Sequence, residues 1–93
     1  MIASFRDKET ERLWRVGKSR RIPTDLQRSA FKKLAILNAA VALENLRVPP
    51  GNQLEALRGD RAGQHSIRIN DQYRVCFVWR ERNAFDVEIV DYH

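Results

Sequence analysis

The feature that most constrains the fold is a change in hydrophobic period about two thirds of the way along the chain. Before residue 47, apolar residues recur every three or four positions, as they do along one side of a helix. From residue 66 onward they alternate with polar residues, as they do in strands that bury one face. Helices followed by a run of strands predict an α+β fold.

Two helices are expected in the first half of the chain. Asp7 is typical of an N-cap for the segment KETERLWRV, and Gly17 is expected to end that helix. This helix is expected to bury one side through Leu13, Trp14 and Val16.

The second helix is expected over residues 24–46, where Thr24 and Gln27 have the spacing of a capping box. Its apolar stripe comprises Leu26, Ala30, Leu34, Leu37 and Val41. The other side carries Arg28, Lys32 and Lys33. This basic side could be a solvated face, a binding surface or the docking site of a partner protein.

Three strands are expected over residues 66–70, 72–80 and 84–93, joined by short turns into an antiparallel meander. Residues 1–5 are interpreted as a further short strand, with Ile2 and Phe5 directed inward, and residues 47–64 as a loop. The predicted order is β-α-α-β-β-β, with both helices on one face of the sheet. The inward side chains would be Tyr73, Val75, Phe77, Trp79, Val87 and Ile89.

The opposite face of the sheet would then be open and would carry Arg74, Cys76 and Tyr92. Such a face is a plausible platform for a functional site.

Size and composition indicate one domain spanning residues 1–93. With 43% hydrophobic and 31% charged residues, the chain is typical of a soluble globular protein and too apolar for a disordered one. No stretch approaches the ~20 apolar residues of a membrane span, and charges interrupt the N-terminus where a signal peptide would be apolar. A cytoplasmic protein is expected, with no membrane association.

Metal and disulfide chemistry are not indicated. Cys76 is the only cysteine, so no intrachain disulfide can form. His65, Cys76 and His93 are too scattered for a zinc site, and we expect neither a metal nor another cofactor.

The charge balance points to a polyanionic partner. The net charge is +5, and thirteen of the 17 basic residues are arginine, whose planar guanidinium suits phosphate. Nucleic acid is the first candidate, although many small basic proteins bind none.

Several polar side chains could meet on or beside the open face: Glu55, Arg58, Arg74, Asp91, Tyr92 and His93. This set suits RNA cleavage, in which the 2′-hydroxyl attacks the neighbouring phosphodiester. Glu55 or His93 could act as the base, Tyr92 or His93 as the acid, and the arginines as phosphate ligands, with Arg68 as a further candidate.

Each of these residues also has an ordinary structural interpretation. Glu55 and Arg58 could pair with each other, Asp91 could pair locally, and Tyr92 could fill the core. Arg74 could be a salt-bridged strand residue, and His93 a frayed end.

The segment LEALRGDRAGQHSIRINDQYRVCFVW, followed by VEIVDYH, resembles the HigB branch of the RelE/ParE toxins of bacterial toxin–antitoxin modules. The resemblance covers nearly the whole chain and rests on the Leu57, Gly59 and Asp60 loop, the SIRINDQYRV hairpin and the terminal DYH.

This resemblance implies a RelE/ParE-like fold and a ribosome-dependent endoribonuclease, an mRNA interferase that cuts mRNA in the ribosomal A site and so inhibits translation. It implies a helix-turn-helix antitoxin of the HigA type, and binding of operator DNA through the complex with that antitoxin. By position, Arg58 matches a lysine or arginine in the family's loop, and Arg74 matches a strand arginine that contacts phosphate. Asp91, Tyr92 and His93 match its C-terminal active-site residues.

One position departs from the family pattern. Some relatives carry histidine in the loop where this chain has Glu55, and a carboxylate of ordinary pKa near ~4.3 is a weaker base than histidine. The residue that acts as general base is therefore open between Glu55 and His93.

Two alternatives from other classes remain at this point. One is a non-nuclease inhibitor of the ParE type, which shares the fold and acts by binding DNA gyrase. The other is a nonenzymatic RNA-binding module that uses the basic side of the second helix.

Overall fold

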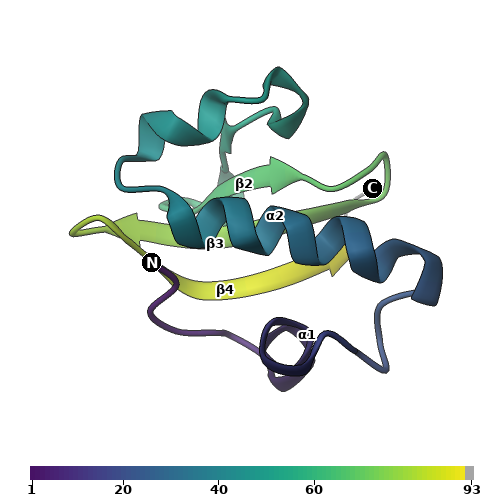
Figure 1. Cartoon of the computed structure of the whole chain (residues 1–93). Coiled ribbons are helices and arrows are strands. Elements are labelled where there is room, and N and C mark those ends of the chain that lie inside the picture. The colour runs from purple at the N-terminus through teal and green to yellow at the C-terminus, as the bar shows by residue number, and fades with distance from the viewer. Residues whose placement is uncertain (92–93) are drawn as a thin grey trace.

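The computed structural model describes residues 1–91, and its helices and strands form two layers (Figure 1). The helices are α1 (Lys8–Val16) and α2 (Gln27–Ala39). The strands β1 (Glu55–Ala56), β2 (His65–Arg68), β3 (Tyr73–Arg80) and β4 (Asn83–Asp91) form one antiparallel sheet in the order β1-β2-β3-β4. α2 crosses one face of the sheet, and α1 packs against α2 and β4. The α+β prediction is therefore confirmed.

The predicted element order is wrong at two points, the first being the N-terminal strand. Residues 2–5 make only two isolated parallel bridges to β4, Ile2 with Ala84 and Phe5 with Val87. Between these bridges β4 contains a bulge, with Asp86 in a left-handed conformation (φ +52°) and its N–H donated to the Ser4 hydroxyl at 2.9 Å. The extra residue breaks the repeat of the ladder, so no continuous strand forms there.

The second point is the segment expected to be a loop. Its residues Glu55 and Ala56 pair with Ser66 and His65 and thereby add the edge strand β1. Two residues with no apolar alternation give no strand signal in the sequence, so this strand could not be predicted.

α1 has the predicted ends. The Asp7 carboxylate accepts the N–H of Thr10 at 3.0 Å, and Gly17, at φ +77°, donates its N–H to the Leu13 carbonyl. Leu13 is buried, but Val16 is 62% exposed, contrary to expectation. Thr10 is fully buried instead, because its hydroxyl accepts a backbone hydrogen bond from β4.

α2 is shorter than predicted. Residues Thr24–Leu26 form a 3-10 turn, and no capping box forms, because the Gln27 side chain donates instead to the carbonyls of Ser19 and Ile22. The helix ends at Ala39, since the Asn45 side chain accepts the N–H groups of residues 41 and 42 and starts a separate turn. The stripe Leu26, Ala30, Leu34 and Leu37 is buried as predicted, whereas Val41 is 65% exposed.

Residues 41–54 form a small lobe beside β2 that is tied to α2 through Asn52. This buried side chain donates to the carbonyls of Leu46 and Val48 and accepts from Lys33 Nζ at 2.5 Å. Burial, and secondarily the charge of Arg68, lower the pKa of Lys33. The lobe and α2 therefore share one polar anchor.

The buried apolar residues form one cluster between α2, α1 and the sheet. Val75, Phe77, Val87 and Ile89 are at most 1% exposed, and Tyr73 and Trp79 pack partly buried against them, as predicted.

The outer edge of β4 is held by polar side chains from the N-terminal region. The Ile89 N–H donates to Thr10 Oγ1 at 3.0 Å, and Arg21 Nη2 donates to the Ile89 carbonyl at 3.2 Å. Arg21 also pairs with Asp7 at 2.8 Å. Both backbone groups of Ile89 that point away from β3 are thus occupied, which fixes the strand two residues before Asp91.

Candidate functional site

The strand register brings chemically active residues together on the face of the sheet that α2 does not cover. Alternation along β3 and β4 sends Val75 and Ile89 into the core and their neighbours Arg74, Cys76, Glu88 and Val90 to the other face. One row across this second face comprises Glu55, Ser66, Cys76 and Glu88, and the next comprises Arg68, Arg74 and Val90.

Arg74 is the best-fixed member of this group. Its Nε donates to Ser66 Oγ at 2.7 Å and its Nη2 to the Gln53 carbonyl at 2.6 Å, and the side chain is only 9% exposed. Nη1 makes no hydrogen bond with another described residue. The guanidinium is thus oriented in advance, with donors left for an anion.

The expectation of a fully open second face is wrong at Arg74 and Cys76, since Cys76 is completely buried. The segment after β1 folds back over this face, where Arg61 donates to Glu88 at 2.7 Å. Burial, which is the largest cause, raises the pKa of the Cys76 thiol.

Glu55 and Arg58 lie at the exposed edge of the same face. Together with Ala56 and Leu57 they line a hollow of about 430 Å³. Neither of the two charged side chains makes an ion pair with any of residues 1–91, so the interpretation that they simply neutralise each other is wrong. Glu55 is the Cα partner of Ser66, which holds Arg74.

Arg68 is the Cα partner of Arg74 on β2 and is half-buried. Its Nη2 contacts the Asp71 carboxylate, and its charge contributes to the lowered pKa of Lys33. Two guanidinium groups thus lie on neighbouring strands, and that of Arg68 is paired with Asp71.

Asp91 lies on the other side of the sheet from Arg74. It is the Cα partner of Tyr73 and accepts a hydrogen bond from Gln72 Nε2 at 3.0 Å. With Arg21, Ile22, Tyr73 and Ile89 it lines a smaller hollow of about 170 Å³. Tyr92 and His93 lie outside the described residues, so their predicted roles stay predictions.

Sequence reasoning missed Ser66 and the Gln53 carbonyl, which orient Arg74. Ser66 could have been found by pairing the strands in register, because it lies directly opposite Cys76. The Gln53 carbonyl gives no signal in the sequence.

No helix within residues 1–91 is long and apolar enough to cross a bilayer. In the same part of the chain, no three His, Cys, Asp or Glu side chains are grouped so as to hold a metal ion.

Comparison with known proteins matches one family model and two relatives by sequence. A family model described as the RelE-like toxin of the type II toxin–antitoxin system HigB matches residues 3–93. Toxin HigB-1 of Vibrio cholerae is 45% identical over 80 residues, which cover 85% of this chain and 84% of that toxin. An uncharacterized protein of Haemophilus influenzae is 34% identical over 80 residues, covering 85% and 77% of the two chains.

Among solved structures, a chain of the YoeB–YefM complex from Staphylococcus aureus superposes with a TM-score of 0.61. The match covers 100% of this chain and 98% of that one at 12% identity, so it concerns the fold alone.

Proposed function

The chain belongs to the HigB-like family of RelE-like toxins from type II toxin–antitoxin systems, and on that basis we propose that it is a ribosome-dependent endoribonuclease. It cleaves mRNA in the ribosomal A site and thereby stops translation. It is neutralised in the cell by a helix-turn-helix antitoxin of the HigA type, and the complex of the two binds operator DNA through the antitoxin.

The observation that carries the proposal is the fixed guanidinium of Arg74. Its bonds to Ser66 and Gln53 leave Nη1 available, and Arg68, which pairs with Asp71, is its Cα partner on β2. A cleavable phosphodiester gains negative charge as the 2′-oxygen attacks, and pre-oriented donors stabilise that charge without reorganising. Arg58 lines the same hollow as Glu55 and is suited to hold a neighbouring phosphate.

Glu55, the carboxylate that lines the hollow, and the C-terminal residues carry out the proton transfers. Glu55 or His93 removes the 2′-hydroxyl proton, and Tyr92 or His93 protonates the departing 5′-oxygen. The P–O5′ bond breaks as the O2′–P bond forms, which leaves a 2′,3′-cyclic phosphate and a 5′-hydroxyl. Val90, the Cα partner of Arg74, brings the end of β4 to the strand that carries the guanidinium.

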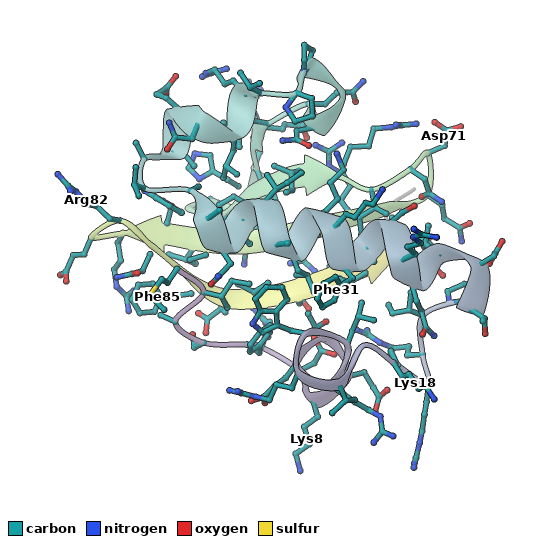
Figure 2. All side chains as sticks on the ribbon, in the orientation of Figure 1. Lys8, Lys18, Phe31, Asp71, Arg82 and Phe85 are labelled. Carbon is teal, nitrogen blue, oxygen red and sulfur yellow. The ribbon has the colours of Figure 1, made fainter. Side chains whose placement is uncertain are left out.

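The test is cleavage of an mRNA on purified ribosomes, with the new 5′ ends identified by phosphorylation with polynucleotide kinase. We expect 5′-hydroxyl ends, and Arg74→Lys should reduce single-turnover cleavage by ~10²–10³-fold, because a point charge replaces a forked donor. Ser66→Ala removes one of the two hydrogen bonds that orient the guanidinium and keeps the bond to Gln53, so it should give a smaller reduction. Arg82→Lys, at the exposed tip of the β3–β4 turn (Figure 2), is the matched control.

Two results would contradict the proposal. The first is cleavage by folded Arg74→Lys and Ser66→Ala within threefold of the wild type. The second is an absence of mRNA cleavage together with accumulation of gyrase–DNA cleavage complexes, which would favour the ParE-type alternative.

A further inference from the structure

One of the two hydrogen bonds that orient Arg74 comes from a part of the fold to which the proposed chemistry assigns no role. The acceptor is the Gln53 carbonyl, at 2.6 Å, in the lobe of residues 41–54 that lies beside α2 and β2 (Figure 1). Because peptide groups are planar, the backbone dihedral angles on either side set the direction of a carbonyl. The orientation of the guanidinium therefore depends on what fixes the backbone at residue 53.

Gln53 has a backbone conformation that it would not favour by itself. Its φ is +44° and its ψ is +57°, in the left-handed region that costs energy for any residue with a Cβ atom. Its side chain is exposed, and within residues 1–91 this side chain makes no hydrogen bond. Such a conformation persists where the surrounding structure determines it. The neighbouring residues must therefore hold Gln53 in place.

Asn52 is the neighbour that is held most firmly. It is completely buried, and its amide donates to the carbonyls of Leu46 and Val48 at 3.2 and 3.3 Å. Both donor bonds stay within the lobe. Its oxygen instead accepts from Lys33 Nζ, at 2.5 Å, and this bond reaches out of the lobe to α2. Lys33 thus fixes Asn52, and with it the start of the segment that carries the Gln53 carbonyl.

Lys33 lies in an unfavourable place for a lysine. The side chain is half-buried, and burial, followed by the charge of Arg68, lowers its pKa. Within residues 1–91 no carboxylate forms an ion pair with it. Its hydrogen bond to the buried oxygen of Asn52 is therefore the contact through which this cation contributes to the fold.

We propose that Lys33 and Asn52 are positioning residues for RNA cleavage, which hold residue 53 so that its carbonyl keeps the Arg74 guanidinium turned toward the phosphate. This inference rests on the proposed function, because it assigns both residues to the reaction proposed there. A donor that acts on the transition state affects the rate of the chemical step more than substrate binding. A displacement of about 1 Å at a positioned group is enough to cost ~10²-fold in rate.

The experiment measures single-turnover cleavage of mRNA on ribosomes at a series of concentrations of the full-length chain. It gives a maximal rate and a half-saturating concentration for each variant. Asn52→Ala should lower the maximal rate by about 10–100-fold, and Lys33→Met by about tenfold, with the half-saturating concentration within about twofold of the wild type. Lys33→Met keeps the length of the side chain and removes only the donor, and it keeps the test decisive if Asn52→Ala does not fold.

Two matched controls separate positioning from general effects on the fold and on charge. Asn45→Ala changes another asparagine of the lobe, whose side chain accepts the N–H groups of residues 41 and 42 and does not contact Asn52. Lys8→Met removes an exposed lysine from α1, away from the lobe (Figure 2). Thermal melts report the stability of all four variants. Both controls should cleave at the wild-type rate, even where Asn45→Ala lowers the Tm.

A double-mutant cycle with Arg74→Lys shows whether the two residues act through Arg74. Lysine has no forked guanidinium for the Gln53 carbonyl to orient. Added to Arg74→Lys, either Asn52→Ala or Lys33→Met should therefore slow cleavage by less than about threefold. A full further loss in this background would mean that the two residues act elsewhere, and the inference would be wrong.

Side-chain NMR tests the orientation of Arg74 without any need for cleavage. The Arg74 Nε–H, identified by its loss in Arg74→Lys, should exchange slowly with water in the wild type, because it is buried and donates to Ser66. Asn52→Ala and Lys33→Met should speed this exchange about tenfold or more.

The outcomes distinguish this inference from the proposed function. If the wild type cleaves mRNA and both variants cleave within threefold of it, the positioning role is wrong and the proposed function stands. If the wild type does not cleave mRNA, the proposed function fails. Unchanged exchange of the Arg74 Nε–H in both variants would then refute the link to Arg74 as well, whereas faster exchange would still support it.

Discussion

Replacing Thr10 by valine should destabilise the chain by removing one acceptor at the edge of β4. Thr10 is fully buried, and its hydroxyl accepts the Ile89 N–H at 3.0 Å. Valine has nearly the same shape and a similar helix propensity, so neither a cavity nor a change in helix stability contributes. The substitution leaves a buried N–H without an acceptor, which costs about 1–3 kcal/mol.

For a domain of this size, about 2 kcal/mol corresponds to a decrease of roughly 8–16 °C in Tm. Urea unfolding followed by tryptophan fluorescence gives the free energy, because Trp14 and Trp79 both pack against the core. The slope of the transition should not change, since the surface exposed on unfolding is the same. Circular dichroism at increasing temperature gives the Tm independently.

The control is Thr10→Ser, which keeps the hydroxyl and removes one methyl group. It should cost about 1 kcal/mol, the loss expected for one buried carbon. The reasoning is refuted if Thr10→Val unfolds within 0.5 kcal/mol of the wild type, or if Thr10→Ser is the less stable of the two.

Three further predictions concern other parts of the chain. Because burial raises its pKa, the Cys76 thiol stays protonated at neutral pH; iodoacetamide should label it only after unfolding, and labelling of the native chain followed by mass spectrometry would contradict this. Gly17→Ala should cost about 1–2 kcal/mol because its φ is +77°, whereas Gly51→Ala, with no positive φ and no nearby atom, should unfold in urea like the wild type. Tyr92→Phe and His93→Ala should each slow single-turnover mRNA cleavage by ~10²–10⁴-fold, and a change below threefold in both would exclude these side chains from proton transfer.

Local signals in the sequence were sufficient for much of the fold. Asp7 and Gly17 mark the ends of α1 because a cap depends only on neighbouring residues. The alternation from Tyr73 to Ile89 predicts both the strands and their buried face, because one covered face imposes a period of two.

The errors arise where a side chain takes over backbone groups, either close in sequence or from a distant part of the chain. α2 ends early because Asn45 binds the N–H groups that would have continued it, and Val16 is exposed because α1 turns Thr10 toward Ile89. Arg74 was identified as a site residue, yet its burial depends on the Gln53 carbonyl, 21 positions away. The contacts of Thr10 with Ile89 and of Arg74 with Gln53 follow from the tertiary fold and have no local pattern.

The covered edge of β4 has a consequence for how this chain meets other chains. Within residues 1–91, the bridges from Ile2 and Phe5 and the side chains of Thr10 and Arg21 occupy the outward backbone groups along much of that strand. The opposite edge, β1, is only two residues long. Exposed strand edges are the usual templates for intermolecular sheet extension and amyloid-like aggregation. We expect a toxin released from its antitoxin to resist self-association by strand addition, and any partner to recognise its helices or its sheet face through side chains.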